Sequence, residues 1–417
     1  MNSYTRLTLI GFLLFMARGM TGPLSSLYWR SLGASYVAIG LLGTVTSVTS
    51  IVFSYIWGKA SDSAGQRRLF LIGGLVGLAL SFGLLVGATD AVLLFPIHAA
   101  SAIAQTAYNI ASLAMMGDWL EQRARQRAVS DRTKLTERSS GRRMGTYRGL
   151  SSLGFGLMAF ISGSIADGFS LRVPYAFAAA FHVVALILAL GVREVPISGD
   201  GAESNDPVTH PERGSSGSRD GRQLPLAPLL VSALVWSLVT GAVYAVWGNY
   251  MVDEVGYTPA QMTRIWAIAS LSEFPLMIVA GWLSDRVGRL PMLAIGFVVW
   301  TLVFVGYLVA PRMPYIVLIQ LTRGFAYSAY TATSMIYAAE VRSRAERGRM
   351  SGIYGTAGAL GAILGSSLGG AITQYIGFRA LIAFSAGLVS VAAVYVGGAA
   401  VRHASKTGPY SKADPAL

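Results

Sequence analysis

The chain has 417 residues, of which 53% are hydrophobic and only 13% are charged, whereas an ordinary soluble domain has roughly 25% charged residues. This composition argues against a water-soluble globule and indicates a protein with many membrane spans. The net charge of +13 would suggest nucleic-acid binding in a soluble protein, but in a membrane protein it records topology. No cysteine is present, which excludes disulfides, iron–sulfur clusters and thiolate zinc sites.

Twelve stretches are long and apolar enough to cross a bilayer, because about twenty helical residues at 1.5 Å each span roughly 30 Å of hydrocarbon. They run over Leu7–Trp29, Val37–Trp57, Leu69–Ala88, Val92–Met116, Met144–Ala166, Val173–Val192, Ala227–Val252, Pro259–Leu283, Met292–Ala310, Pro314–Ala339, Met350–Ile376 and Ala380–Val401. The first stretch lacks a small-residue cleavage site, so it predicts a retained span rather than a signal peptide. The predicted fold class is an all-α membrane protein with twelve transmembrane helices.

Basic residues fall mainly on one side of these spans. Of the 33 Lys and Arg residues, 25 lie on the side that holds both chain ends. Because short cytoplasmic loops collect Lys and Arg, both termini are predicted to be cytoplasmic, in a cell's inner membrane. The basic loop Glu121–Arg143 either binds anionic lipid or a partner or is a solvated determinant of topology.

One long segment, Val195–Pro225, is polar, and its Gly, Ser, Pro and Asp content cannot build a core. It is predicted to be a cytoplasmic linker over residues 195–225. The linker separates an N-terminal six-helix bundle, residues 1–194, from a C-terminal six-helix bundle with a short cytoplasmic tail, residues 226–417.

An internal repeat relates these two halves. The segments GKASDSAGQRR, from Gly58, and GWLSDRVGR, from Gly281, each follow an even-numbered span and begin 223 residues apart. From Tyr147 onward the matching residues are 207 apart, so the first half carries an insertion in its basic loop. Six spans in each half and one common orientation predict parallel repeats about an axis along the membrane normal.

The repeated loop, Gly-x-x-x-Asp-x-x-Gly followed by Arg, resembles the signature between helices 2 and 3 of major facilitator superfamily transporters, and its second copy lies between helices 8 and 9. The resemblance covers Leu7–Val401. It implies two pseudo-symmetric bundles that alternate access to a central site. It also implies a cytoplasmic gating latch, for which the candidates are Asp62, Arg67, Arg68, Asp285, Arg286 and Arg289. The alternative is a simple turn whose basic residues only set topology.

The spans differ in polarity with a period of three. Helices 3, 6, 9 and 12 are apolar on all faces, as lipid-exposed helices are, whereas helices 1, 4, 7 and 10 carry polar stripes at helical spacing and are predicted to line a cavity. Candidate substrate-binding residues on these stripes are Arg18, His98, Gln105, Tyr108, Asn109, Tyr244, Trp247, Arg323, Tyr327 and Tyr330. The alternatives are helix packing for the aromatic residues and a satisfied polar side chain for His98.

Three ionisable residues lie well inside spans: Arg18, Arg323 and Glu273. Such groups are costly in a bilayer and mark functional sites. Two arginines against one carboxylate predict a substrate with a carboxylate or phosphate. Glu273 is interpreted as a proton carrier, or alternatively as a permanent salt bridge to one of the two arginines.

The predicted function is secondary active transport of a small organic anion by alternating access, coupled to protons. A proton-driven multidrug efflux antiporter is the alternative, and a channel is a third option. No phosphate-binding loop, nucleophile elbow or His-Glu-x-x-His zinc motif occurs. Enzymatic activity, a cofactor and a metal are therefore not expected. The expected partners are the solute, protons and the lipid bilayer, for a chain that acts as a monomer.

Overall fold

The computed structural model describes residues 3–64, 66–130, 138–192, 224–341 and 347–407. Within these ranges it leaves out the side chains of residues 62, 117–118, 120–130, 138–152, 274, 339, 347–348, 351 and 406–407. The predicted linker over residues 195–225 lies outside the described residues except for its last two positions. The side chains of the basic loop, and that of Asp62, also lie outside them.

The described part of the chain is helical and contains no strand. The first half comprises α1 (Ser3–Thr21), α2 (Ser25–Ser31), α3 (Tyr36–Ala64), α4 (Arg67–Gly87), the short η1 (Ala91–Leu93), α5 (Leu94–Ser130), α6 (Arg138–Gly168) and α7 (Val173–Leu190). The second half comprises α8 (Leu226–Asn249), η2 (Tyr250–Glu254), α9 (Pro259–Val287), α10 (Arg289–Val309), α11 (Tyr315–Glu340), α12 (Arg347–Tyr375) and α13 (Phe378–Thr407).

Each of the twelve predicted spans lies on a helix of the structure. By length and composition alone, eight helices of the described residues can cross a membrane, and the number rises to ten if two bent pairs each count as one span. The helices α6 and α11 complete the set: α6 contains a shorter apolar stretch at Leu153–Gly168, and α11 is interrupted by the polar side chains of its stripe.

Prolines bend two of the spans. The first predicted span is divided at Pro23 into α1 and α2, which meet at 51°, because proline has no N–H for the helix. Pro275 lies inside α9, whose two parts are bent by 43°. Pro96 also lies within a predicted span, the fourth, but it falls in the first turn of α5, where the backbone N–H has no partner within the helix.

The two helices that flank the predicted basic loop extend into it. The fourth span ends at Met116 in the prediction, yet α5 continues to Ser130, and α6 begins at Arg138, before the predicted start of the fifth span. The residues of this extension from Asp118 onward include neither Gly nor Pro and are rich in Gln, Arg and Ala, which favour helix. Part of the predicted basic loop is therefore helical.

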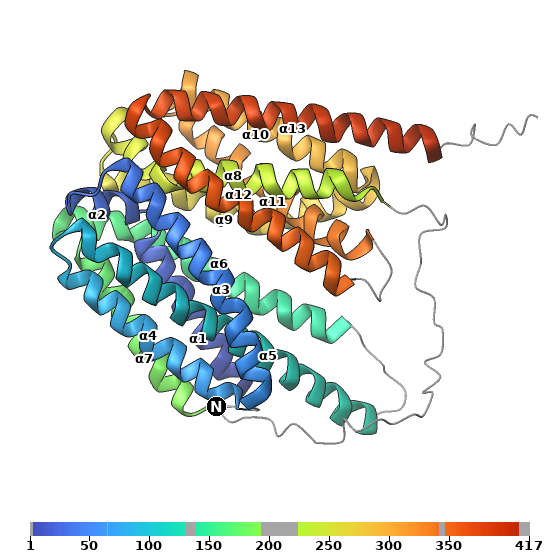
Figure 1. Ribbon diagram of the computed structural model, residues 1–417. Coiled ribbons are helices and arrows are strands. Elements are labelled where there is room, and N and C mark those ends of the chain that lie inside the picture. The colour runs from blue at the N-terminus through green and yellow to red at the C-terminus, as the bar shows by residue number, and fades with distance from the viewer. Residues whose placement is uncertain (1–2, 65, 131–137, 193–223, 342–346, 408–417) are drawn as a thin grey trace, which may run out of the picture.

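The helices form two bundles, blue to green and yellow to red in Figure 1. In the first half α1 packs on α6 and α7, and α4 on α5 and α7. In the second half α8 packs on α12, α9 on α11, and α10 on α11 and α13. The α8–α12 contact is backbone to backbone, because a side chain on Gly361, Gly365 or Gly369 would overlap the carbonyl of Leu234, Leu238 or Ala242.

The halves meet through α3 with α12 and α6 with α9. We call the end of the molecule where these contacts concentrate the Tyr36 end. There the hydroxyl of Tyr36 donates to Oδ2 of Asp253 over 3.1 Å, and the backbone N–H of Tyr36 donates to Oε1 of Gln374 over 3.0 Å. One helical turn further along α3, a side chain on Gly370 would overlap the Tyr36 carbonyl and come within 3.1 Å of the Gly40 Cα atom. The two halves thus touch backbone to backbone.

A second contact at the same end joins α6 to α9. The carboxylate of Asp167 accepts a hydrogen bond from the backbone N–H of Ala260 over 3.0 Å, at the N-terminus of α9, where a negative charge is favourable. Arg264 donates to the hydroxyl of Ser164 over 3.0 Å. One half therefore caps a helix of the other.

Helices α4, α7, α10 and α13 expose large apolar side chains along their length, including Leu80, Ile187, Leu302 and Val394, which are 59–77% accessible. In water such surfaces would be unfavourable, but lipid tails solvate them. These are the helices for which the sequence predicts lipid contact.

Candidate functional site

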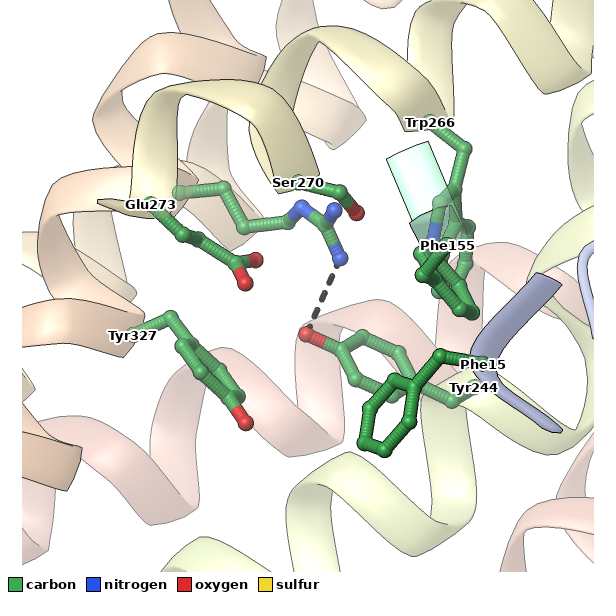
Figure 2. A pocket seen from close by; sticks show the side chains of 8 residues that line it. Phe15, Phe155, Tyr244, Trp266, Ser270, Glu273 and Tyr327 are labelled. Carbon is green, nitrogen blue, oxygen red and sulfur yellow. Dashed lines mark hydrogen bonds between the residues drawn. The ribbon is translucent and has the colours of Figure 1, made fainter. Parts of the chain in front are cut away.

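A cavity of about 240 Å³ lies between the two halves, and we call it the central pocket. Its walls come from α1, α6, α8, α9 and α11 and comprise Phe15, Phe155, Tyr244, Trp266, Ser270, Glu273, Arg323 and Tyr327. Figure 2 shows these side chains around the shared space. The first half contributes two phenyl rings, and the second half contributes every polar group.

Helical spacing brings these residues to one place. Trp266, Ser270 and Glu273 follow one another at intervals of four and three on α9, so they share one face of that helix. Arg323 and Tyr327 are four apart on α11 and also share a face. The hydroxyl of Ser328 donates to the Glu273 carbonyl over 3.1 Å and ties these two helices together at the level of the pocket.

Arg323 is the most deeply buried charged group of the central pocket, with 3% of its surface accessible. Its Nη1 donates to the hydroxyl of Tyr244 over 3.0 Å, and its guanidinium carbon lies 4.7 Å from the centre of the Trp266 ring. The face of that ring attracts the cation. Its Nε and Nη2 atoms have no hydrogen-bond partner among the described residues. Both atoms are covered by surrounding side chains in this arrangement, so an anion with acceptor oxygens could pair with them once those side chains move.

Glu273 lines the same pocket. Among the described residues, its carboxylate forms no ion pair with Arg323 within 4.0 Å. Figure 2 shows the carboxyl group of Glu273 directed into the space that the Tyr327 ring also borders. A carboxyl group that lines a cavity without a close ion pair is a chemical candidate for binding and releasing a proton.

Two further predicted residues of the second half lie behind the pocket wall. Trp247 is 2% accessible and packs edge-on against Trp266, with ring centres 4.9 Å apart. Tyr330 stacks on Trp236 at 3.9 Å and 9° and shares a hydrogen bond of 3.2 Å with Tyr354. Trp247 supports a ring of the central pocket, and Tyr330 belongs to a neighbouring cavity.

The predicted residues of the first half lie elsewhere. Arg18 is exposed, with its guanidinium carbon 5.7 Å from the centre of the Phe15 ring, and it is not part of the central-pocket lining in the described structure. His98 bonds through Nδ1 to the carbonyl of Leu94 over 2.8 Å and packs edge-on against Trp29. Neither residue meets Glu273 or Arg323 in this arrangement.

The polar stripe of α5 divides in the same way. Gln105 donates to the side chain of Asn109 over 2.9 Å, and Asn109 is exposed. Tyr108, by contrast, is 5% accessible and belongs to the apolar core of the first half. None of these three residues lines the central pocket among the described residues.

The predicted latch residues of the second half form one cluster, at the end of the molecule that we call the Arg289 end. Arg289 donates to Asp285 over 2.6 Å and to both carboxylate oxygens of Glu340 over 3.0 Å each. The guanidinium of Arg286 lies over the Trp282 ring at 3.8 Å. These contacts join α9, α10 and α11 within one half.

In the first half, Arg67 begins α4, and Arg68 donates to the carbonyl of Leu190 on α7 over 2.6 Å. The side chain of Asp62 lies outside the described residues, so the counterpart of the Arg289–Asp285 pair is not described. The gating role of all six latch residues stays a prediction.

Four lining residues are not among the candidates named from the sequence: Phe15, Phe155, Trp266 and Ser270. The signal for two of them was present, because Ser270 and Trp266 precede Glu273 by three and seven positions on its helix face. Phe155 gave no such signal, since a single phenyl ring in an apolar helix is ordinary core composition. No group of three or more His, Asp or Glu side chains suited to a metal occurs in the described part of the chain.

Two bundles of membrane helices with a polar pocket between them define a multi-pass membrane transporter of the major facilitator type. Residues 4–385 match the model of the MFS_1 like family, and the chain belongs to that family. It is similar to Sugar efflux transporter C of Escherichia coli strain K12, with 23% identity over 400 residues that cover 93% of each chain.

Two other comparisons point the same way. Multidrug resistance protein MdtG of Citrobacter koseri is 24% identical over 404 residues, which cover 92% of this chain and 91% of that protein. The crystal structure of the nucleoside transporter NupG superposes with a TM-score of 0.75 at 15% identity and covers 96% of this chain and 99% of that chain. This structural likeness establishes the fold.

Proposed function

We propose that this transporter carries a small organic anion across the cytoplasmic membrane by alternating access, with Arg323 binding the anion and Glu273 carrying a proton. The observation that supports this most directly is the buried Arg323 guanidinium, which has two donors without a partner among the described residues and faces a pocket of about 240 Å³. A buried charge of this kind is stable only with a counter-charge or hydrogen-bond acceptors close by.

The charge distribution supports the proposed orientation, with both termini and the Arg289 end in the cytoplasm. The contacts at the Tyr36 end would then close the site on the outside. A central pocket walled by two halves suits rocking of one half against the other better than a continuous pore.

The test is a thermal-stability screen of the purified protein against organic acids, sugar phosphates, neutral sugars, nucleosides and cationic drugs. A ligand that binds only the folded state raises the melting temperature by mass action. We expect carboxylates or phosphates to give the largest shifts, and a hit to show saturable uptake and counterflow in proteoliposomes driven by a pH gradient. Stabilisation by cationic drugs alone, or a non-saturating current, would contradict the proposal.

A second candidate is a proton-driven multidrug antiporter. The aromatic lining supports it, since Phe15, Phe155 and Trp266 offer apolar faces to amphipathic compounds. The similarity to a protein named for multidrug resistance supports it as well. In that case Glu273, rather than Arg323, would bind the cationic compounds of the screen.

A further inference from the structure

A second cavity, of about 270 Å³, lies wholly within the second half, between α8, α11 and α12. We call it the tyrosine pocket, after Tyr327, Tyr330 and Tyr354 in its wall. No charged side chain lines it in the described part of the chain. The central pocket, in contrast, contains both a guanidinium and a carboxyl group. The tyrosine pocket therefore offers a ligand aromatic faces and hydroxyl groups, and no charged partner for an ionic group.

The wall of the tyrosine pocket is aromatic and rigid. Trp236 stacks on Tyr330 with parallel rings 3.9 Å apart, and its other contacts include the edge of Trp300 at 5.2 Å. Tyr327 stands at 51° to Trp236 with ring centres 5.8 Å apart. Rings that hold one another in place present fixed faces, and binding to them costs little side-chain entropy.

Hydroxyl groups border these rings. Tyr330 and Tyr354 share a hydrogen bond of 3.2 Å, and each hydroxyl can also bond a ligand as donor or acceptor. Ser237, Thr331 and Ser334 add three more hydroxyl groups to the lining. Aromatic faces combined with many hydroxyls suit a ring that carries oxygen or nitrogen substituents better than a plain hydrocarbon.

Glycine keeps this cavity open. A side chain at Gly355 would meet no atom within 4 Å of its Cβ, although Gly355 is part of the lining. Gly352, one turn earlier on α12, is equally unobstructed but is not a lining residue. Because only Gly355 belongs to the lining, we expect a leucine there to reduce the cavity and a leucine at Gly352 to leave it unchanged.

Tyr327 lines both the tyrosine pocket and the central pocket, so the two pockets adjoin at this side chain. We propose that the tyrosine pocket is a second subsite, which binds a neutral ring with hydrogen-bonding substituents, either a sugar or a nucleobase, while the anionic group of the same ligand binds Arg323. This assignment rests on the proposed function for its anionic half only.

The test compares Gly355→Leu with Gly352→Leu, two changes that raise helix propensity equally. The probes are glucose and phenyl glucoside for the sugar arm, and uridine and adenosine for the nucleobase arm, with binding measured by calorimetry. At least one of these neutral rings should bind the parent and Gly352→Leu equally, and Gly355→Leu at least about tenfold more weakly. Absence of binding by all four probes, or equal binding by both leucine variants, overturns the proposal.

Two controls keep the outcomes apart. Tyr354→Phe removes a hydroxyl without adding volume, so it tests the pocket even if Gly355→Leu does not fold. It should weaken the sugar arm several-fold and change the nucleobase arm little, because stacking needs no hydroxyl. Equal binding of all four probes by parent and Tyr354→Phe would count against the hydroxyl contacts.

The second control is Arg323→Ala, which should leave the four neutral probes bound but abolish binding of inorganic phosphate. If phosphate binding persists, the proposed function fails while the ring subsite stands.

Discussion

The wall of the central pocket that the first half supplies consists of Phe15 and Phe155, whereas the second half supplies Arg323, Glu273 and the hydroxyl groups. The tyrosine pocket lies in the second half as well. Two bundles of one architecture thus differ in chemistry. A ligand held mainly by the second half would keep most of its contacts as the first half moves, and only the apolar contacts to the first half would change between states.

The largest effect is expected when one mid-membrane arginine is removed from each half, which tests directly whether the second half binds the ligand more strongly than the first. Arg323→Ala should weaken binding of the best anionic ligand by about tenfold to a hundredfold, because hydrogen bonds to a charged group contribute about 1.5–3 kcal/mol. Arg18→Ala, its counterpart in the first half, should change the affinity by less than about threefold. Calorimetry on both variants measures this, and equal losses would contradict the asymmetry.

The second prediction concerns the proton. Glu273→Gln should abolish accumulation driven by a pH gradient while solute exchange continues, since glutamine keeps the shape of the side chain but carries no titratable proton. At a gradient of about one pH unit the lost accumulation is about tenfold for one proton per solute. Glu254→Gln, at an exposed position of η2, is the control. Undiminished gradient dependence in Glu273→Gln would exclude the proton-carrier role.

A smaller effect is expected from the apolar wall of the first half. Phe155→Ala should weaken ligand binding by about threefold to tenfold, because part of the apolar area that covers the ligand is lost. Phe177→Ala, at a ring of α7 that is 44% accessible, should leave affinity unchanged. If Phe155→Ala weakened binding as much as Arg323→Ala does, the two halves would contribute equally.

The smallest effect should come from the arginines at the Arg289 end. Arg289→Gln removes contacts to two carboxylates, Asp285 and Glu340, both of which are largely exposed. Exposed pairs contribute about 0.2–1 kcal/mol, so the melting temperature should fall by about 1–4 °C. A fall much larger than about 4 °C would show that these ion pairs contribute more than exposed pairs do.

The spans and their polar stripes could be predicted because the length of an apolar stretch and the spacing of its polar residues can both be read directly from the sequence. Arg323 and Tyr327 are four residues apart, and that interval alone assigns them to one face of α11. The spacing along one helix does not show which other helix, or which cavity, that face of the helix will contact. The α5 stripe shows this, because His98 bonds to the carbonyl of its own helix and Tyr108 enters the core of its half, although their spacing resembles that of α11.

The same limit applies to Arg18 and Glu273. Both are ionisable and lie within predicted spans, yet only Glu273 lines the central pocket. The rotation of each helix about its axis decides which face meets the cavity, and that rotation depends on packing against helices distant in sequence. The break at Pro23 adds to this, because it separates the direction of α2 from that of α1.

The backbone contact between Gly40 and Gly370 has a mechanical consequence. Attraction between atoms in direct contact is short-ranged, and a gap of about 0.5–1 Å already loses a quarter to a half of it. Gly40 and Gly370 have no side chains that could extend to maintain the contact, and the hydrogen bonds of Tyr36 to Asp253 and Gln374 at the same end are also short-ranged. A separation of about 1 Å therefore already weakens the whole joint. We expect the Tyr36 end to be either closed or fully open. The rate of turnover would then depend on how long the closed state lasts and not on a gradual widening of the opening. The chain has no native cysteine, so dye pairs on introduced cysteines would report two discrete distances, and a continuous range would show that the joint yields gradually.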